Sequence, residues 1–137
     1  IPDAFKSELL SGTHNFANGG NTFKIALYTD ISGYSTSSTT YSTTNEVSSS
    51  GTNYSAGGNA LDSQAVSVAS NTALVDFADE VFSSVTLSAV GAVIYNDTNS
   101  DKLVVVLDFG GTKTATNGDF TIQFPAAGAS TAIIRIA

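Results

Sequence analysis

Residues 85–136, VTLSAVGAVIYNDTNSDKLVVVLDFGGTKTATNGDFTIQFPAAGASTAIIRI, decide the fold of this chain. Two apolar segments, residues 88–95 and 103–109, flank a polar turn that leaves no room for a helix. Two more, residues 120–124 and 131–136, follow short breaks that contain Gly, Asn or Pro. Runs rich in Val, Ile and Phe between such turn residues are typical of antiparallel strands. The stretch therefore predicts a β-meander with a hydrophobic interior.

Four earlier regions also have strand patterns. Residues 22–29, TFKIALYT, alternate between two faces, and residues 59–68 and 73–77 are further strand candidates. Residues 43–48 predict one more short strand. Together with the meander this gives about eight strands joined mainly by hairpins, which favours an all-β fold, either an antiparallel β-sandwich or a jelly-roll-like barrel. We expect a single β domain over residues 1–137.

Residues 1–12 carry the helix signal of the chain. Asp3 is expected to cap the helix and Gly12 to end it. The apolar residues at helical spacing between them are Ala4, Phe5, Leu9 and Leu10. We expect residues 1–16 to form a short N-terminal helix or arm that packs on the domain or docks on a neighbouring protein.

Residues 30–58 form a long segment rich in Ser, Thr, Gly and Asn. Its few large apolar side chains include Tyr34, Tyr41, Val47 and Tyr54. They are too few to bury a core of their own, and loops this long are commonly functional or ordered by a partner. Because tyrosine gives contact area at a low entropic cost, the three tyrosines predict either a recognition surface or a set of anchors for the loop.

The composition narrows the classes of function. Charged residues make up 12% of the chain, about half the usual share, so Ser, Thr, Asn and Gly must supply most of the polar surface. The net charge is −7 and the five basic residues are scattered, so we expect no nucleic-acid binding. The chain has no Cys, and no apolar run is long enough for a membrane span.

His14 is the only histidine and so the one candidate for a histidine base. A catalytic triad also needs a nucleophile and an orienting acid, but Ser and Asp are too common here to discriminate. No G-x-S-x-G motif occurs, so a loop histidine near the end of the helix is the favoured interpretation. We expect no catalytic residue and no enzyme.

Two acidic groups bear on metal or glycosidase chemistry. Residues 97–101, DTNSD, match the start of a calcium loop, but Lys102 stands where that loop requires Gly. A polar hairpin turn explains the pattern better. Asp76, Asp79 and Glu80 form the second group, but glycosidase clefts are usually lined with aromatics and the chain has no Trp. We expect a solvated turn there, with no metal and no other cofactor.

Several phrases in fixed order resemble a known family. They are FKIALYT (residues 23–29), YSTTNEVSSSGTNYSAGG (41–58), VGAVIYN (90–96), VVVLDFGGTKTATNGDFTIQFPAA (104–127) and AIIRIA (132–137). Together with the N-terminal AFKSELLSGTHNF segment, they resemble the small virion structural proteins of tailed bacteriophages. The resemblance covers nearly the whole chain and rests on the number and order of the phrases, not on a catalytic motif.

The resemblance implies a non-enzymatic particle component, foremost an outer capsid decoration (cement) protein that binds across neighbouring capsid subunits. The expected location is the virion, assembled in the cytoplasm of a bacterial host. The expected partners are the major capsid protein or other virion proteins, and a homo-oligomer, guessed as a trimer, would suit a capsid's local threefold axes. The expected partner-binding residues are Phe5, Leu9, Leu10, Tyr34, Tyr41 and Tyr54.

Three other functions stay open from the sequence. A tail, neck or fibre component of the virion would look the same. A carbohydrate-binding surface module could use Tyr34, Tyr41 or Tyr54, although sugar platforms usually favour Trp. A hydrolase would have to depend on His14.

Overall fold

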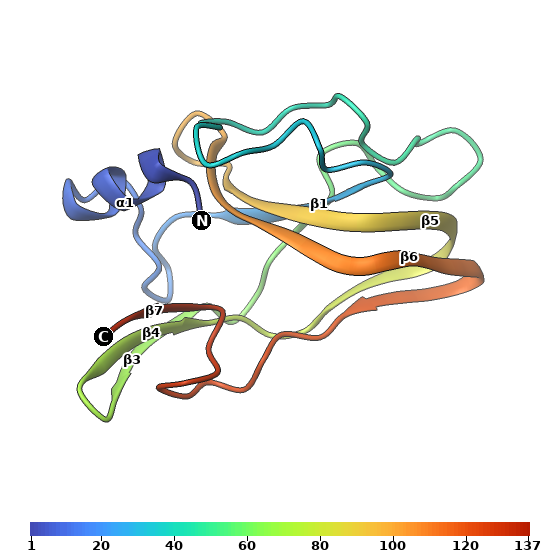
Figure 1. The fold of residues 1–137 in the computed structure, drawn as a ribbon. Coiled ribbons are helices and arrows are strands. Elements are labelled where there is room, and N and C mark those ends of the chain that lie inside the picture. The colour runs from blue at the N-terminus through green and yellow to red at the C-terminus, as the bar shows by residue number, and fades with distance from the viewer.

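The computed structural model describes residues 1–137 as one short helix and seven β-strands (Figure 1). The elements are, in chain order, α1 (Asp3–Leu10), β1 (Phe23–Tyr28), β2 (Asn59–Ala60), β3 (Ala65–Ala69), β4 (Thr72–Asp76), β5 (Glu80–Asn96), β6 (Lys102–Ile122) and β7 (Ile134–Ile136). The strands form two antiparallel sheets, with the orders β2-β1-β5-β6 and β3-β4-β7. The expected all-β fold is confirmed, with one strand fewer than expected.

One long hairpin, β5–β6, dominates the fold. The strands have 17 and 21 residues, and they pair from Asn96 and Lys102 at the turn to Glu80 and Ile122 at the open end. Both strands bend near the middle, so the two halves of the hairpin face each other (Figure 1). Register shifts along the pair and a positive φ at Gly110 accompany the bend, as β-bulges do. A single hairpin thus supplies two layers of the domain.

The main hydrophobic core draws on both halves of this hairpin. It contains 23 buried hydrophobic residues, including Phe82 and Val85 from the first half of β5 and Ile94 from the second. At one end of the core, Phe16 stacks on Phe23 with 4.3 Å between the ring centroids. This aromatic group continues into α1, which is thereby part of the core and not a free arm.

A second, smaller cluster lies on the opposite face of the larger sheet. Its buried members are Ala26, Tyr28, Val93, Tyr95 and Leu103. The segment of residues 30–58, which passes over β1 and β5 in Figure 1, covers this face and packs Ile31, Tyr34 and Tyr41 on it. Strand β1 is therefore buried on both faces.

Two strand expectations before the meander are wrong. Residues 59–68 form two strands, β2 and β3, that belong to different sheets. Ser63 lies between them with a φ of 55°, and left-handed backbone interrupts an extended chain. Residues 43–48 form no strand, because Glu46 makes only an isolated bridge with Tyr28.

Within the meander the strand boundaries also differ. The segments 103–109 and 120–124 belong to one strand, β6, because residues between 110 and 119 remain paired with β5 despite their Gly, Thr and Asn content. Of residues 131–136, only Ile134–Ile136 is a strand. It pairs with β4 in the smaller sheet instead of continuing the meander.

Helix α1 lies where the apolar spacing places it. The expected cap is wrong, because Pro2 is the N-cap residue and no side chain caps the helix. Asp3 lies in the first turn, where its carboxylate accepts a hydrogen bond from the Lys6 ammonium at 3.0 Å. The helix ends at Ser11, and Gly12 follows with a φ of 79°.

We predict that Gly58→Ala severely destabilises the fold. Gly58 has a φ of 75° beside β1, and an added Cβ would overlap the carbonyl oxygen of Ile25. Gly51, with a φ of 71° and no atom within 4 Å of such a Cβ, is the matched control. Left-handed backbone costs about 1–2 kcal/mol in either variant, and the overlap adds about 3 kcal/mol for Gly58→Ala only. Equal losses in urea unfolding followed by tyrosine fluorescence would contradict this account.

Candidate functional site

Exposed large hydrophobic side chains gather at one end of the molecule. Six such side chains are well exposed, and they are Ile1, Leu10, Val66, Val68, Val81 and Ile136. All except Val81 belong to α1, its N-terminal neighbour or the smaller sheet. Single exposed apolar residues are ordinary, but a contiguous group marks a site of interaction.

The smaller sheet supplies an aliphatic face to this group. Its register aligns Val66, Val75 and Ile134 in one row across β3, β4 and β7. The next row on the same face consists of Val68, Ala73 and Ile136. The first row is buried except at Val66, whereas Val68 is 73% exposed and Ile136 is 53% exposed. One half of the face is thus covered by the chain, and the other half is open.

Helix α1 faces this sheet across a groove. Phe5 is only 2% exposed, and Leu9, four residues on and therefore on the same side of the helix, packs against the core. Leu10 lies a further 100° around the helix and is 89% exposed. Two hollows of about 300 and 350 Å³ run between α1 and the sheet and share Leu9, Ile134 and Ile136. We call these two hollows the α1–β7 groove.

His14 holds α1 on the larger sheet. Its side chain is fully buried, and its Nε2 lies 2.8 Å from Glu8 Oε2. The amide of Asn96 donates to His14 Nδ1 at 3.1 Å, so Nε2 carries the proton and donates to Glu8. Lys102 completes the group at 3.3 Å from the other oxygen of Glu8. Both ring nitrogens are engaged within the fold, which makes His14 a structural residue.

The carboxylate of Glu46 anchors the loop of residues 30–58. Tyr41 donates its hydroxyl to Oε1 at 2.5 Å, and Tyr54 donates to Oε2 at 2.6 Å. The backbone N–H of Gly57 donates to Oε2 at 2.7 Å. Tyr54 also accepts the N–H of Leu27 at 3.0 Å, which ties this group to β1. We call Glu46 and its donors the Glu46 anchor.

The remaining tyrosines extend this anchor over the sheet. Tyr28 donates to the carbonyl of Ser42 at 2.6 Å, and Tyr34 donates to the Tyr28 hydroxyl at 2.9 Å. Tyr95 donates to the carbonyl of Gly57 at 2.6 Å. All five tyrosines of the chain are therefore used to hold the loop.

Burial also favours the protonated form of four of these hydroxyls. Desolvation is the largest cause that raises the pKa of Tyr28, Tyr41, Tyr54 and Tyr95 above the usual tyrosine value. For Tyr41 and Tyr54, the nearby Glu46 carboxylate raises the pKa further. These four hydroxyls accordingly remain hydrogen-bond donors above the pH at which an exposed tyrosine ionises.

The six expected partner-binding residues do not form one surface. Tyr34, Tyr41 and Tyr54 belong to the loop of residues 30–58, where Tyr54 is only 3% exposed and Tyr34 and Tyr41 are half-buried. The others belong to α1, and among them Leu10 is the one with a freely exposed side chain. Of the two roles open to the tyrosines, the geometry supports anchoring.

The exposed apolar surface at this end of the molecule includes side chains that the sequence analysis did not single out. They are Val66, Val68 and Ile136. The alternation of valine in residues 65–69, AVSVA, is a strand signal that could have placed both valines on one face. It could not have told which face stays uncovered.

The acidic groups serve the fold locally. The turn of residues 97–101 has left-handed backbone at Ser100 and Asp101, and its Thr98 hydroxyl accepts the N–H of Thr22 at 2.8 Å. Asp79 accepts the N–H of Phe124 at 2.8 Å. No three His, Cys, Asp or Glu side chains come close enough together to hold a metal ion.

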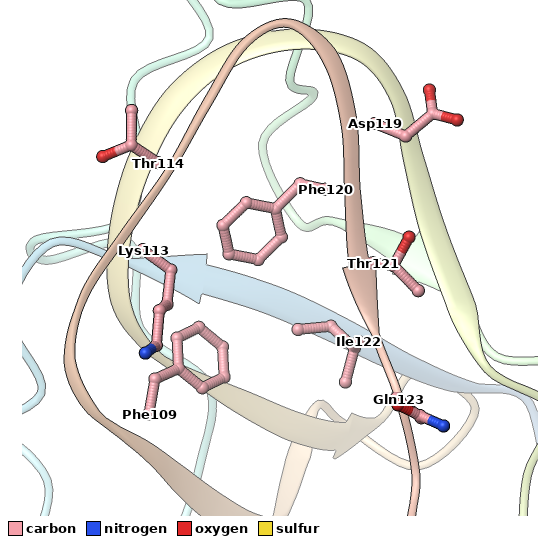
Figure 2. Close-up of a pocket in the computed structure, with 8 residues that line it drawn as sticks. All are labelled: Phe109, Lys113, Thr114, Asp119, Phe120, Thr121, Ile122 and Gln123. Carbon is pink, nitrogen blue, oxygen red and sulfur yellow. The ribbon is translucent and has the colours of Figure 1, made fainter.

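The largest hollow, about 430 Å³, lies in the bend of the β5–β6 hairpin. Figure 2 shows Phe109, Phe120 and Ile122 inside the bend, with the Lys113 amine beside Phe109 and the Asp119 carboxylate pointing away. The two phenyl rings are 6.0 Å apart, and Lys113 belongs to none of the ion pairs. The hollow can take up an apolar group, but it offers no facing acid and base.

No protein-family model, curated protein or solved structure matches this chain. The single helix has eight residues, which is far too few to cross a membrane.

We predict that Glu46→Gln destabilises the protein by about 2–4 kcal/mol, because hydrogen bonds to a charged acceptor are lost and one donor is left facing an amide nitrogen. Urea unfolding at neutral pH measures the loss. Asp62→Asn removes the same charge from an exposed carboxylate that makes no side-chain hydrogen bond, and it should change stability by less than about 0.5 kcal/mol. Similar effects of the two substitutions would show that Glu46 is not an anchor.

We predict the opposite sign for Glu80→Gln. Burial raises the pKa of Glu80, so ionisation at neutral pH opposes folding, while a glutamine oxygen can still accept the hydrogen bond that Asn59 donates at 2.9 Å. The variant should melt at a higher temperature at pH 7. The gain should vanish below about pH 4, where Glu80 is protonated in both states. Asp97→Asn is the control, and a gain that does not depend on pH would contradict the role of ionisation.

Proposed function

We propose that this chain is a non-enzymatic structural protein of a tailed-phage virion, most specifically an outer capsid decoration protein that binds across neighbouring capsid subunits. The observation that carries the proposal is the open aliphatic surface formed by Leu10, Val68 and Ile136 at one end of an otherwise polar molecule. The collinear sequence phrases are the reason to place the chain in a virion, and the open surface gives it a means of attachment to the particle.

The physical properties of the chain suit such a role. A decoration protein needs a persistent shape, and here a polar loop is held by hydrogen bonds to the Glu46 carboxylate without any disulfide. The low content of charged residues lets Ser, Thr and Asn face water while the apolar end docks on another surface. Docking would bury the exposed side chains at the α1–β7 groove, and that gain offsets the lost freedom of the two partners.

The finer architecture belongs to the same proposal. We propose that the domain be regarded as a β-sandwich, because the bent hairpin brings the two halves of β5 and β6 into facing layers. In the virion, this domain would act as a homo-oligomer, with a trimer matching a local threefold axis. The partner would be the major capsid protein or another virion protein.

We predict that Leu10→Ser combined with Val68→Ser lowers attachment to virus particles that lack this protein. Each side chain is largely exposed, so the free protein should lose less than about 0.5 kcal/mol of stability. The apparent affinity for particles should fall by about tenfold or more, since two apolar contacts of about 1 kcal/mol each are lost. Occupancy can be measured by sedimentation of particles with added protein.

Val81→Ser is the matched control, because Val81 is exposed but lies on β5, away from α1 and the smaller sheet. Undiminished occupancy of the double variant would reject the open aliphatic surface as the attachment surface. Mass spectrometry and labelled electron microscopy of intact virions address the location. Copies on the shell support decoration, copies on the tail or neck support the alternative component, and absence from the virion would overturn the proposal.

A further inference from the structure

Strand β7 presents a free edge to the α1–β7 groove. It is the outer strand of the order β3-β4-β7 and pairs only with β4. No backbone group of Ile134–Ile136 makes a hydrogen bond to any other part of the chain. A free edge of this kind is a template for an added strand, and proteins commonly cover or charge such edges. Here neither a helix nor a loop pairs with it.

The groove runs along this edge. The hollow between α1 and β7 is lined by Ile134, Arg135 and Ile136 in succession. Successive side chains of a strand point to opposite faces, so a hollow that touches all three lies beside the strand and not over one face. Its far wall consists of α1 residues, among them Leu9 and Leu10. An incoming strand would therefore find backbone partners on one side and apolar contacts on the other.

The charges along the groove favour the binding of acidic side chains. The chain has twelve acidic residues, but none lines either hollow of the groove. Two of its five basic residues, Lys6 and Arg135, do. Lys6 is paired with Asp3, whereas Arg135 takes part in no ion pair and only donates to the carbonyl of Ala129 at 3.4 Å. Arg135 thus offers an unused positive charge at the open edge.

We propose that the free edge of β7 takes up an extended segment of another protein, with alternating aliphatic and acidic side chains, as the fourth strand of the smaller sheet. Main-chain hydrogen bonds would give affinity, and the groove would select the side chains, as in other cases of strand addition. The identification of the partner as a neighbouring virion protein rests on the proposed function. The free edge of β7, the α1–β7 groove and the charge of Arg135 do not depend on that function.

A second copy of this chain fits the edge less well. Symmetric antiparallel pairing of two Ile134–Ile136 segments about their centre places one Arg135 opposite the other. Like charges directly opposite each other destabilise a pair of strands, whereas a carboxylate opposite Arg135 stabilises it. The occupant is accordingly a different, acidic segment.

The test uses two synthetic peptides and the isotope-labelled full chain in NMR titrations. One peptide is acetyl-Thr-Val-Asp-Val-Asp-Val-Thr-amide, and its counterpart has lysine in place of both aspartates. The acidic peptide should shift the amide signals of Ile134–Ile136 and of Leu9 and Leu10. The lysine peptide should bind about tenfold more weakly, because attraction at Arg135 is replaced by repulsion.

Charge-reversal variants make the test specific. Arg135→Glu should reverse the preference between the peptides, whereas Lys113→Glu, the same change in the bend of the β5–β6 hairpin, should leave it unchanged. Equal binding of both peptides, shifts confined to other surfaces, or no shifts at about 1 mM peptide would overturn the proposal. Concentration-dependent dimerisation that shifts the amide signals of Ile134–Ile136 would also overturn it in favour of a second copy. These titrations need no virion, so their failure is distinguishable from failure of the proposed function.

Discussion

The outer layer of this protein depends on the carboxylate of Glu46. Residues 30–58 are too polar to fold by apolar burial alone, yet they cover a buried cluster on one face of the larger sheet. Tyrosine rings provide the buried area, but each buried hydroxyl must find a partner or cost about 1–3 kcal/mol. One carboxylate satisfies two of these hydroxyls and a backbone N–H, and it is held against β1 through Tyr54. With the loop in place, β1 is buried on both faces and becomes the centre of the domain.

This arrangement separates the anchored loop from the exposed apolar surface. The tyrosines that could have recognised a partner are engaged within the fold, so the loop presents mostly Ser, Thr and Asn to the solvent. At the other end, α1 and the smaller sheet cover each other only in part. Leu10, Val68 and Ile136 remain exposed there because no further segment of residues 1–137 extends over them. The apolar surface and the free edge of β7 both occur where α1 and the smaller sheet leave each other uncovered.

Local pattern predicted most elements but not their lengths. The alternation of TFKIALYT and the apolar run of residues 88–95 placed β1 and the second half of β5, since period and side-chain type reflect the local backbone. The length of β6 was missed, because its Gly- and Thr-rich middle is held extended by pairing with β5 and not by its own propensity. The α1 residues were predicted as a group, but only packing separates the buried Phe5 from the exposed Leu10.

The sequence by itself determined the all-β class and the site of the one helix, and it left the tyrosines of the long polar loop as either anchors or a recognition surface. These properties follow from composition and from periodicity over a few residues. Only the tertiary structure decided that Glu46 is the common acceptor, that His14 is buried, and that the edge of β7 is free. Each of these depends on which distant segments meet, such as Asn96 with His14 or β4 with β7, and contacts of this range leave no periodic mark in a single sequence.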